Sequence, residues 1–319
     1  MENQDKQPET STQMHRLDRN SSPAQKSGMA NVVTPCRLDL ELFDGYRTYV
    51  YFYPPPAGVK RLEPVLYVHG IQSHPGWFGG SSGALATAGF PVYQVARRGS
   101  GENRINPGHA DSANQLFDDI DCAIDFVLAQ EKIGDQNLSA KVNLLGVSWG
   151  GKLLSCYCLG PDRAKRVKNL VLVAPGIVPQ VDVGVSTKLA IAASLIFGGG
   201  RLFPIPLNEV ELFTDNPARQ QFLLDDSLRL HKATARFLFV SRMLDTMLKN
   251  PQAHSLRLPT TLLQANRDRI IDNKATKALL SKLAGENLQV HNLPAAHTIE
   301  FEQDPGEFYG LLVKALVRP

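Results

Sequence analysis

Residues 142–152, with the sequence V-N-L-L-G-V-S-W-G-G-K, constrain the fold of this chain more than any other stretch. A short apolar run, typical of a buried strand, leads through G-x-S-x-G into a helical pattern. In such a turn the central serine has a strained backbone, and side chains two residues before and after it would collide. Glycines at positions 146 and 150, Gly146 and Gly150, remove this collision, so Ser148 is lifted above the edge of a sheet. Taken alone, the pattern fits a tight turn without chemistry equally well.

The rest of the chain predicts the sheet that such a turn requires. Short apolar segments alternate with helical ones, which is typical of a parallel sheet covered by helices on both faces. Residues 37–43 alternate apolar and polar side chains, and residues 46–53, after Asp44-Gly45, are rich in aromatic and β-branched side chains, which predicts a hairpin. The fold class is therefore α/β, with a mostly parallel central sheet. Its expected strands after the hairpin are residues 65–68, 92–96, 142–147, 170–174, 260–264 and 288–291.

One interval is too long for this alternation. Between the strands expected at 170–174 and 260–264 lie about 85 residues, whereas crossover loops are typically about 2–6 residues long on each side of a helix. This length predicts an inserted helical cap at about residues 177–256. Within it, Asn216-Pro217 predicts the start of a helix, and residues 188–197 form an apolar, alanine-rich segment that ends at three glycines.

Composition limits the classes of partner and location. Residues 1–35 are rich in polar and charged side chains and predict a disordered tail before an α/β domain at 36–319. The net charge of +3 indicates neither nucleic acid nor an anionic membrane as a partner. The chain contains no secretory signal and no apolar run of about 20 residues that could span a membrane, and it carries no signal for an oligomeric state. The four cysteines lack metal-type spacing and suggest a reducing compartment, so we expect a cytoplasmic protein.

Three residues past strand ends have the order of a catalytic triad. In a parallel sheet, ligands bind at the carboxyl ends of the strands, where Ser148 and His297 are expected. A serine hydroxyl needs an imidazole to take its proton and a carboxylate to hold that imidazole in the right tautomer. Asp268 and Asp272 are both candidates for the carboxylate. Asp272 directly precedes a helical pattern and suits a helix N-cap, which favours Asp268 as the acid.

A tetrahedral oxyanion would need two backbone donors. The N–H of Trp149 follows the nucleophile and is one candidate, and the loop after Val68 offers the N–H of Ile71 as the second. His69 is expected to shape that loop through hydrogen bonds. The run R-R-G-S-G at 97–101 lacks the spacing of a nucleotide-binding fingerprint and is interpreted as a turn beside the site. No cofactor and no metal site are predicted, because no histidine pair has ligand spacing with a third partner.

The chain resembles the α/β-hydrolase superfamily over roughly residues 39–317, and within it the monoacylglycerol lipase and lysophospholipase-like group that also contains serine aminopeptidase-like hydrolases. The matching motifs are V-H-G-I at 68–71, R-G-S-G at 98–101, G-V-S-W-G-G at 146–151, N-R-D-R-I-I-D at 266–272 and A-A-H-T-I-E-F-E at 295–302. Two stretches of the insertion, L-F-T-D-N-P at 212–217 and D-D-S-L-R-L at 225–230, also look like the cap of this group. The resemblance implies a Ser148–Asp268–His297 triad and cleavage of esters with lipid-like or aliphatic acyl groups.

The sequence departs from the family at three positions. Val147 stands where a small residue or histidine is usual, Trp149 where methionine or glutamine is common, and Ala96 where an aspartate often opens the R-G-x-G motif. Val147 and Trp149 border the acyl pocket, so they bear on the substrate more than on the reaction. An epoxide hydrolase or dehalogenase is excluded, since those families use aspartate at the position of Ser148.

We therefore expect a serine hydrolase that acts on a small-molecule acyl ester, with the cap gating an apolar pocket. Residues 189–197 are expected either to line this pocket, to touch a lipid surface, or simply to pack the cap onto the core. An acyltransferase, thioesterase or peptidase would use the same acyl-enzyme and remains an alternative. A binding protein that keeps the fold without catalysis is a further alternative.

Overall fold

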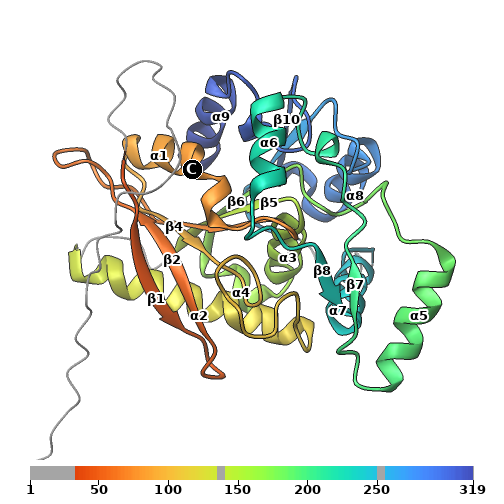
Figure 1. Cartoon of the computed structure of the whole chain (residues 1–319). Helices are drawn as coiled ribbons and strands as arrows, with labels where there is room; N and C mark the ends of the chain where they lie inside the picture. The colour runs from red at the N-terminus through yellow and green to blue at the C-terminus, as the bar shows by residue number, and fades with distance from the viewer. Residues whose placement is uncertain (1–32, 135–140, 250–255, 319) are drawn as a thin grey trace, which may run out of the picture.

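Eight strands form one mixed sheet at the centre of the molecule (Figure 1). The computed structural model of the chain describes residues 33–134, 141–249 and 256–318, so residues 1–32 of the predicted tail lie outside it. The strand order is β1-β2-β4-β3-β5-β6-β9-β10. The strands are β1 Cys36–Glu41, β2 Arg47–Tyr53, β3 Val65–Val68, β4 Val92–Val95, β5 Val142–Val147, β6 Val167–Val173, β9 Thr260–Ala265 and β10 Leu288–Leu293.

The predicted α/β class is confirmed, and so is the hairpin at the start of the sheet. β1 pairs antiparallel with β2, and β2 pairs antiparallel with β4, whereas β3, β4, β5, β6, β9 and β10 all run parallel. Every residue of β5 and β9 is buried, as expected for strands that are covered on both faces. The predicted strands shift only at their ends: β6 begins three residues earlier, at Val167, and β10 runs on to Leu293.

Helices cover both faces of the sheet. Figure 1 shows α1 and α9, which pack against each other, on one side and α2 with α3 on the other. Outside the insertion the helices are α1 Gly79–Thr87, α2 Ala113–Gly134, α3 Trp149–Cys158, α4 Pro161–Ala164, α8 Asn273–Ala284 and α9 Gly306–Leu316. The sequence did not predict α1, because its residues G-G-S-S-G-A-L-A-T have little apolar periodicity and three glycines.

Side chains cap the starts of several helices. The Ser112 hydroxyl accepts a hydrogen bond from the N–H of Gln115 at 3.0 Å, which is one half of a capping box. The Gln115 side chain, however, accepts from the N–H of Asp111 at 2.8 Å and not from that of Ser112. Asn216 caps the helix that begins at Pro217, since its Oδ1 accepts from Ala218 N at 3.1 Å.

The chain between β6 and β9 forms the segment predicted to be a cap, and we call residues 177–256 the cap segment. It contains α5 Val185–Ile196, α6 Pro217–Asp225 and α7 Ala235–Lys249. It also contains a two-stranded antiparallel sheet of β7 Leu202–Pro204 and β8 Lys232–Thr234, which the sequence did not predict. Three-residue strands carry too little periodicity to be distinguished in a sequence.

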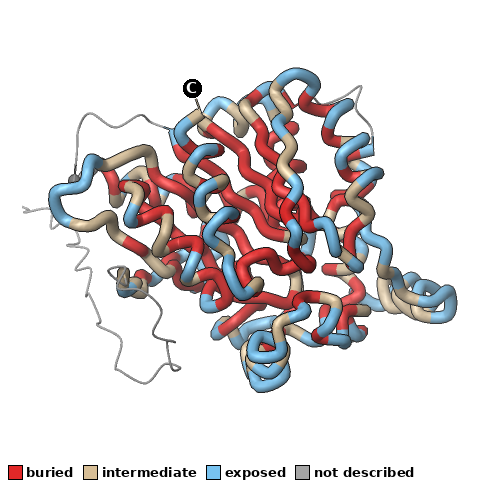
Figure 2. Tube along the Cα trace, turned by 90° about the horizontal axis from the view of Figure 1, so that it is seen from above, coloured by how far each residue is buried: buried red, intermediate tan, exposed pale blue. Residues whose placement is uncertain are grey.

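The helices of the cap segment differ in how far they are buried. α7 packs against α3 of the core and buries six side chains, including Phe237, Val240 and Leu244. α5 buries none, and it lies at the far edge of the molecule in both views (Figures 1 and 2). Within the residues that the structure describes, no helix combines the length and the apolar character needed to cross a membrane.

Candidate active site

Ser148 sits on a sharp turn between β5 and α3. Its backbone has φ 51° and ψ −122°, a conformation that is strained for any residue with a side chain. The glycines two residues away fit the predicted reason for the motif. A Cβ at Gly146 would lie 2.7 Å from the Cα of Gly151, and one at Gly150 would lie 2.3 Å from the carbonyl oxygen of Val68. No side chain fits at either position without a backbone shift.

Ser148, His297 and Asp268 form one chain of hydrogen bonds. The Nε2 atom of His297 lies 3.0 Å from Ser148 Oγ, and its Nδ1 lies 2.8 Å from Asp268 Oδ2. The side chain of His297 is 3% exposed and that of Asp268 is fully buried. A buried carboxylate accepts the Nδ1 proton, which leaves Nε2 as the acceptor for the serine proton. The loops after β5, β9 and β10 therefore bring together three side chains that are far apart in the sequence.

The two candidate aspartates have different surroundings. The Oδ1 atom of Asp268 accepts hydrogen bonds from the N–H groups of Ile270 at 2.8 Å and Ile271 at 3.0 Å, which fix the carboxylate with Oδ2 toward His297. Asp272 instead accepts from Ala275 N at 2.9 Å and is the N-cap of α8. The geometry thus places Asp268, and not Asp272, beside the histidine.

Two backbone N–H groups near Ser148 are unoccupied. Within residues 33–134, 141–249 and 256–318, neither Ile71 N nor Trp149 N donates a hydrogen bond to a protein acceptor. Trp149 is the first residue of α3, where N–H groups point away from the helix and carry partial positive charge. Ile71 lies in the loop that follows β3, next to Gly70, whose position for a Cβ is 3.6 Å from Ser148 Oγ. Backbone N–H groups without a protein acceptor are what an oxyanion site requires.

His69 shapes this loop, as predicted. Its Nδ1 donates to the carbonyl of Gly70 at 2.9 Å, and its Nε2 accepts from the N–H of Arg97 at 3.2 Å. Burial, together with the nearby charge of Arg97, holds the pKa of His69 well below its usual value, so the ring is neutral. His69 is thus a structural residue of the loop.

A buried carboxylate connects the loop after His297 to α1. Glu300 Oε1 accepts from the N–H of Ser81 at 2.9 Å, and Oε2 accepts from the Ser81 hydroxyl at 2.5 Å. Burial raises the pKa of Glu300 to about 7, although these hydrogen bonds act in the opposite direction. Because the ordinary pKa is 4.5, the unfolded chain loses this proton at lower pH than the folded chain. The contribution of Glu300 to stability is therefore complete below pH 4.5 and is lost as the pH rises toward 7.

We expect Glu300→Gln to unfold at a higher temperature than the wild-type protein at pH 8, by several degrees, and at nearly the same temperature at pH 5. The amide keeps an acceptor for the Ser81 N–H but carries no charge to bury. Thermal unfolding followed by circular dichroism at both pH values measures the difference. Glu307→Gln, on the exposed first turn of α9, is the control and should shift both temperatures alike. An equal shift for Glu300→Gln at both pH values would contradict the raised pKa of Glu300.

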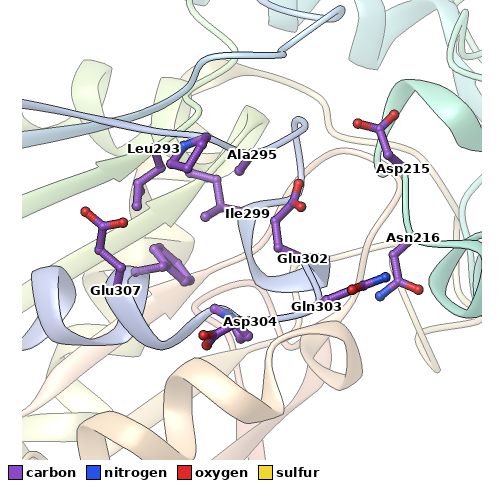
Figure 3. Close-up of a pocket in the computed structure, with 12 residues that line it drawn as sticks. Asp215, Asn216, Leu293, Ala295, Ile299, Glu302, Gln303, Asp304 and Glu307 are labelled. Carbon is purple, nitrogen blue, oxygen red and sulfur yellow. The ribbon is translucent and has the colours of Figure 1, made fainter.

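A cavity of about 250 Å³ lies between the loop after β10 and the start of α9 (Figure 3). Ala295, Ile299 and Phe308 belong to its lining, but Ser148 and His297 do not. A molecule in this cavity would therefore not contact the nucleophile. Among the residues that the structure describes, no three His, Cys, Asp or Glu side chains are grouped so as to hold a metal ion.

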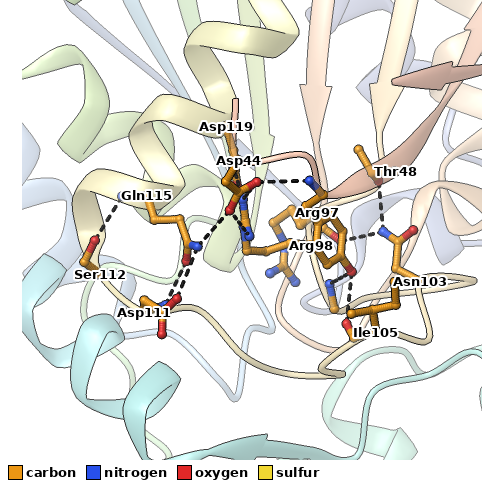
Figure 4. A network of polar contacts seen from close by, with 12 residues as sticks. Asp44, Thr48, Arg97, Arg98, Asn103, Ile105, Asp111, Ser112, Gln115 and Asp119 are labelled. Carbon is orange, nitrogen blue, oxygen red and sulfur yellow. Dashed lines mark hydrogen bonds and ion pairs between the residues drawn. The ribbon is translucent and has the colours of Figure 1, made fainter. Parts of the chain in front are cut away.

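The R-R-G-S-G run after β4 is a turn in which the second arginine is fully paired (Figure 4). Arg98 donates to both carboxylate oxygens of Asp119, at 2.6 and 2.5 Å, and to Asp44 of the hairpin turn at 3.0 and 3.3 Å. The charge of Arg98 is neutralised in place, which agrees with the interpretation of this run as structural. The carbonyl oxygen of Arg97 belongs to the same network and accepts from Asn103 Nδ2 at 3.0 Å, whereas its guanidinium has no carboxylate partner in the described part of the chain.

The sequence did not identify the contacts that the cap segment makes with the site. The ring of Phe213 packs edge-on against His297, with centroids 6.1 Å apart, and the Phe213 carbonyl accepts from Thr298 N at 2.8 Å. The indole of Trp149 stacks on Phe237 of α7 at 5.0 Å. The sequences at 212–217 and 225–230 resemble a cap, but their spacing does not show which core residues they contact.

Comparisons with known proteins show the family and the fold of the chain. A model of the serine aminopeptidase family, S33, matches residues 60–304 of the chain. No curated protein sequence matched. The fold is similar to that of a monoacylglycerol lipase from Paleococcus ferrophilus, with 23% identity over 85% of this chain and 98% of that one and a TM-score of 0.70.

Two further solved structures have the same fold. A soluble variant of monoglyceride lipase from Saccharomyces cerevisiae, in complex with a substrate analogue, has a TM-score of 0.77 and 18% identity over 93% of this chain and 98% of that one. An esterase from Exiguobacterium antarcticum has a TM-score of 0.62 and 18% identity over 88% of this chain and 99% of that one. At such identities these likenesses show a common fold.

Proposed function

The chain belongs to the serine aminopeptidase S33 family of α/β-hydrolases, and we propose that it hydrolyses carboxylic esters of lipid-like or aliphatic acids through an acyl-enzyme on Ser148. The observation that carries this proposal is the hydrogen-bonded chain from Ser148 through His297 to Asp268, beside two N–H groups that have no protein acceptor among the described residues. A nucleophile, its base, the group that orients the base and an oxyanion site are all needed for acyl transfer.

In the proposed reaction, Ser148 Oγ attacks the ester carbonyl carbon while His297 Nε2 takes the hydroxyl proton. The negative charge on the carbonyl oxygen is stabilised by the N–H groups of Ile71 and Trp149. When the bond between the carbonyl carbon and the alkoxy oxygen breaks, His297 gives its proton to the leaving alcohol. A water molecule then attacks the acyl group with His297 as the base again, and the acid leaves. Asp268 stabilises the imidazolium in both halves of the reaction.

An ester substrate fits the charges of the site better than a free amino terminus does. The cap-segment carboxylates next to the site are already paired: Asp226 with His74, Asp245 with Lys152 of α3, and Asp215 with Arg267 beside Asp268. Arg97 adds a buried positive charge beside Trp149, at 4.7 Å from its ring. The ammonium group of an aminopeptidase substrate needs an unpaired carboxylate, whereas an acyl chain packs against aromatic rings such as Phe213 and Trp149. Monoacylglycerols and lysophospholipids are the substrate classes that we propose.

A fluorophosphonate probe, which reacts with activated serines, tests the reaction class. We expect it to label the wild-type protein and not Ser148→Ala. A panel of p-nitrophenyl esters and monoacylglycerols of increasing chain length then measures acyl preference, with an acyl thioester and an aminoacyl p-nitroanilide as the competing substrates. Faster cleavage of the thioester or the anilide than of every ester would replace the proposed substrate class, and equal labelling of both proteins would overturn the enzyme proposal.

We also propose that α5 touches the lipid surface from which an acyl ester is drawn. Val185, Leu189 and Ile196 are 73%, 68% and 80% exposed and lie on one side of the helix, because their spacings of four and eleven residues are close to whole turns. Phe197, which follows, is 87% exposed. Packing onto the core does not account for side chains that face outward. A contiguous exposed apolar surface is typical of a membrane or partner contact. The cytoplasmic location expected from the sequence stays a prediction.

Replacing Leu189 and Ile196 together by serine is expected to reduce co-sedimentation with phosphatidylcholine vesicles several-fold. The variant has less apolar surface to bury in the lipid interface, so its binding free energy is less favourable. Hydrolysis of water-soluble p-nitrophenyl acetate should stay unchanged, since α5 does not contact the triad. Leu224→Ser on α6, where the leucine is 64% exposed, is the matched control and should bind vesicles like the wild-type protein. Equal binding by all three proteins would exclude α5 as the contact.

A further inference from the structure

The loop that carries Ile71 is bound to the cap segment through its own backbone and side chains. The side-chain oxygen of Gln72 accepts from Arg229 Nε at 3.1 Å and from Arg229 Nη2 at 2.9 Å. The main-chain oxygen of Gln72 accepts from the N–H of Leu230 at 2.9 Å. Three hydrogen bonds therefore hold the residue directly after Ile71 to the stretch that follows α6. Gln72 and Arg229 are both buried, so water does not compete for these bonds.

The same stretch binds the loop a second time through Asp226. The Nδ1 atom of His74 accepts from Gly76 N at 3.1 Å, so its Nε2 carries the proton and donates to Asp226 Oδ2 at 3.1 Å. The indole N–H of Trp77 donates to the same oxygen at 2.6 Å. Burial alone would raise the pKa of Asp226, but the hydrogen bonds from His74 and Trp77 outweigh it and lower the pKa. Asp226 is thus an ionised, buried acceptor between the cap segment and the loop.

Trp149 is held by a different part of the cap segment. Its indole N–H donates to the hydroxyl of Ser241 on α7 at 2.9 Å. The ammonium group of Lys152, one turn further along α3, donates to the same hydroxyl at 3.0 Å and to Asp245 at 2.8 Å. The Lys152 and Asp245 side chains are 5% and 11% exposed. Ser241 therefore joins the first turn of α3, which presents the Trp149 N–H, to α7.

Arg97 connects the Ile71 loop to Trp149 at the start of α3. Its Nη2 donates to the carbonyl oxygens of Gly70 at 2.6 Å and Ile71 at 3.2 Å, and its guanidinium lies over the ring of Trp149. Burial lowers the pKa of Arg97 to about 9, which still leaves it charged at neutral pH. The Arg97 guanidinium thus contacts both the carbonyl oxygens of the Ile71 loop and the indole ring of Trp149.

From these contacts we infer that the cap segment positions the oxyanion hole: Asp226, through His74 and Trp77, and Ser241, through the Trp149 indole, are positioning residues that hold the N–H groups of Ile71 and Trp149 where the oxyanion forms. The inference rests on the proposed function of this site. A donor stabilises an oxyanion only when it is already placed at hydrogen-bond distance, and misplacement by about 1 Å can cost up to about a hundredfold in rate. Neither residue touches the substrate. Their effect must therefore appear in the transition state and not in substrate binding.

The test compares Asp226→Asn with Asp225→Asn, a control at the neighbouring residue, and Ser241→Ala with Thr246→Val, a control on the same helix. Asp226→Asn places an amide N–H against the His74 N–H, and Ser241→Ala removes the acceptor of the indole. Asp225→Asn changes an aspartate whose side chain accepts only from the exposed Gln221 among the described residues, and Thr246→Val changes an exposed hydroxyl of α7. Ser241→Thr keeps the hydroxyl and is the rescue variant.

We expect kcat for p-nitrophenyl butyrate to fall about tenfold in Asp226→Asn and in Ser241→Ala, with KM within about twofold of wild type, because only transition-state stabilisation is lost. The inhibition constant of a trifluoromethyl ketone, which forms the tetrahedral adduct, should rise by the same factor. Asp225→Asn, Thr246→Val and Ser241→Thr should keep wild-type values. All variants are compared at a temperature at which circular dichroism shows them folded.

Two results would overturn the inference: wild-type kcat in folded Asp226→Asn and Ser241→Ala, or a lower kcat with unchanged inhibition by the trifluoromethyl ketone. The proposed function is tested separately in the same assay by comparing the wild-type protein with Ser148→Ala. If the wild-type protein cleaves the ester and Ser148→Ala does not, while the positioning variants behave like wild type, then only the inference about the cap segment is wrong.

Discussion

Ser148→Ala is expected to lower kcat for p-nitrophenyl esters by a factor on the order of 10⁶, with little change in KM. The substitution removes the hydroxyl that we propose as the nucleophile, whereas His297, Asp268 and the two N–H groups stay in place. The rate that remains would come from the oxyanion site and from substrate binding, which together still exceed the reaction in water. Steady-state kinetics on the purified variant measure the loss, and burst titration of the wild-type protein gives the concentration of active sites.

Ser155→Ala is the matched control for this variant. Ser155 lies on the same helix and is buried, but its hydroxyl donates to the carbonyl of Gly151 and does not contact the triad. We expect its kcat to stay close to wild type. The alanine at position 148 also relieves no backbone strain, because Ala and Ser tolerate φ 51° equally poorly. A Ser148→Ala protein with a kcat near that of Ser155→Ala would mean that another group is the nucleophile.

Asp268→Asn is expected to lower kcat by about 10⁴. An asparagine of nearly the same shape would keep one acceptor for the N–H groups of Ile270 and Ile271 and would turn its NH₂ group toward His297 Nδ1. The imidazole would then carry its proton on Nε2, where it cannot accept the proton of Ser148. Steady-state kinetics on the same ester measure the loss, and thermal unfolding shows whether the buried site stays intact.

Asp272→Asn separates the two aspartates that the sequence leaves as candidates. Asp272 only accepts from Ala275 N at the start of α8, and asparagine is an equally good N-cap. Its kcat and its unfolding temperature should therefore stay near wild type. The opposite result, a large loss in Asp272→Asn and a small one in Asp268→Asn, would contradict the assignment of the acid.

The sequence predicted the residues whose types are dictated by local chemistry. Gly146 and Gly150 are required by the crowding around Ser148, and Asp272 by the free N–H groups of a helix start, so each could be assigned from its neighbours in the chain. The central strands were predicted because burial on both faces requires continuous apolar runs, such as β5 and β9.

The contacts of the cap segment could not be predicted in the same way. Trp149 and Ser241 are 92 residues apart, and His74 and Asp226 are 152 apart. From the sequence alone, any serine or aspartate of the insertion is an equally good candidate for such a contact. Helix α1 was missed for a different reason: it is stabilised by burial and by the Glu300 carboxylate at its first turn, and its own residues have low helix propensity.

The cap segment lies between two strands that are neighbours in the sheet, so its length affects the conformational entropy that the chain loses when these strands pair. β6 and β9 are direct neighbours, with Leu170 opposite Thr260, so their pairing closes a loop of about 90 residues. The entropic cost of closing a loop grows only with the logarithm of its length, so this loop costs about 1 kcal/mol more than a loop one third as long. Insertions of very different length at this junction are therefore nearly equivalent for the stability of the sheet. A lineage can lengthen or replace the chain between β6 and β9 at small thermodynamic cost, provided that the new chain still supplies partners for the loop that carries Ile71 and for the first turn of α3.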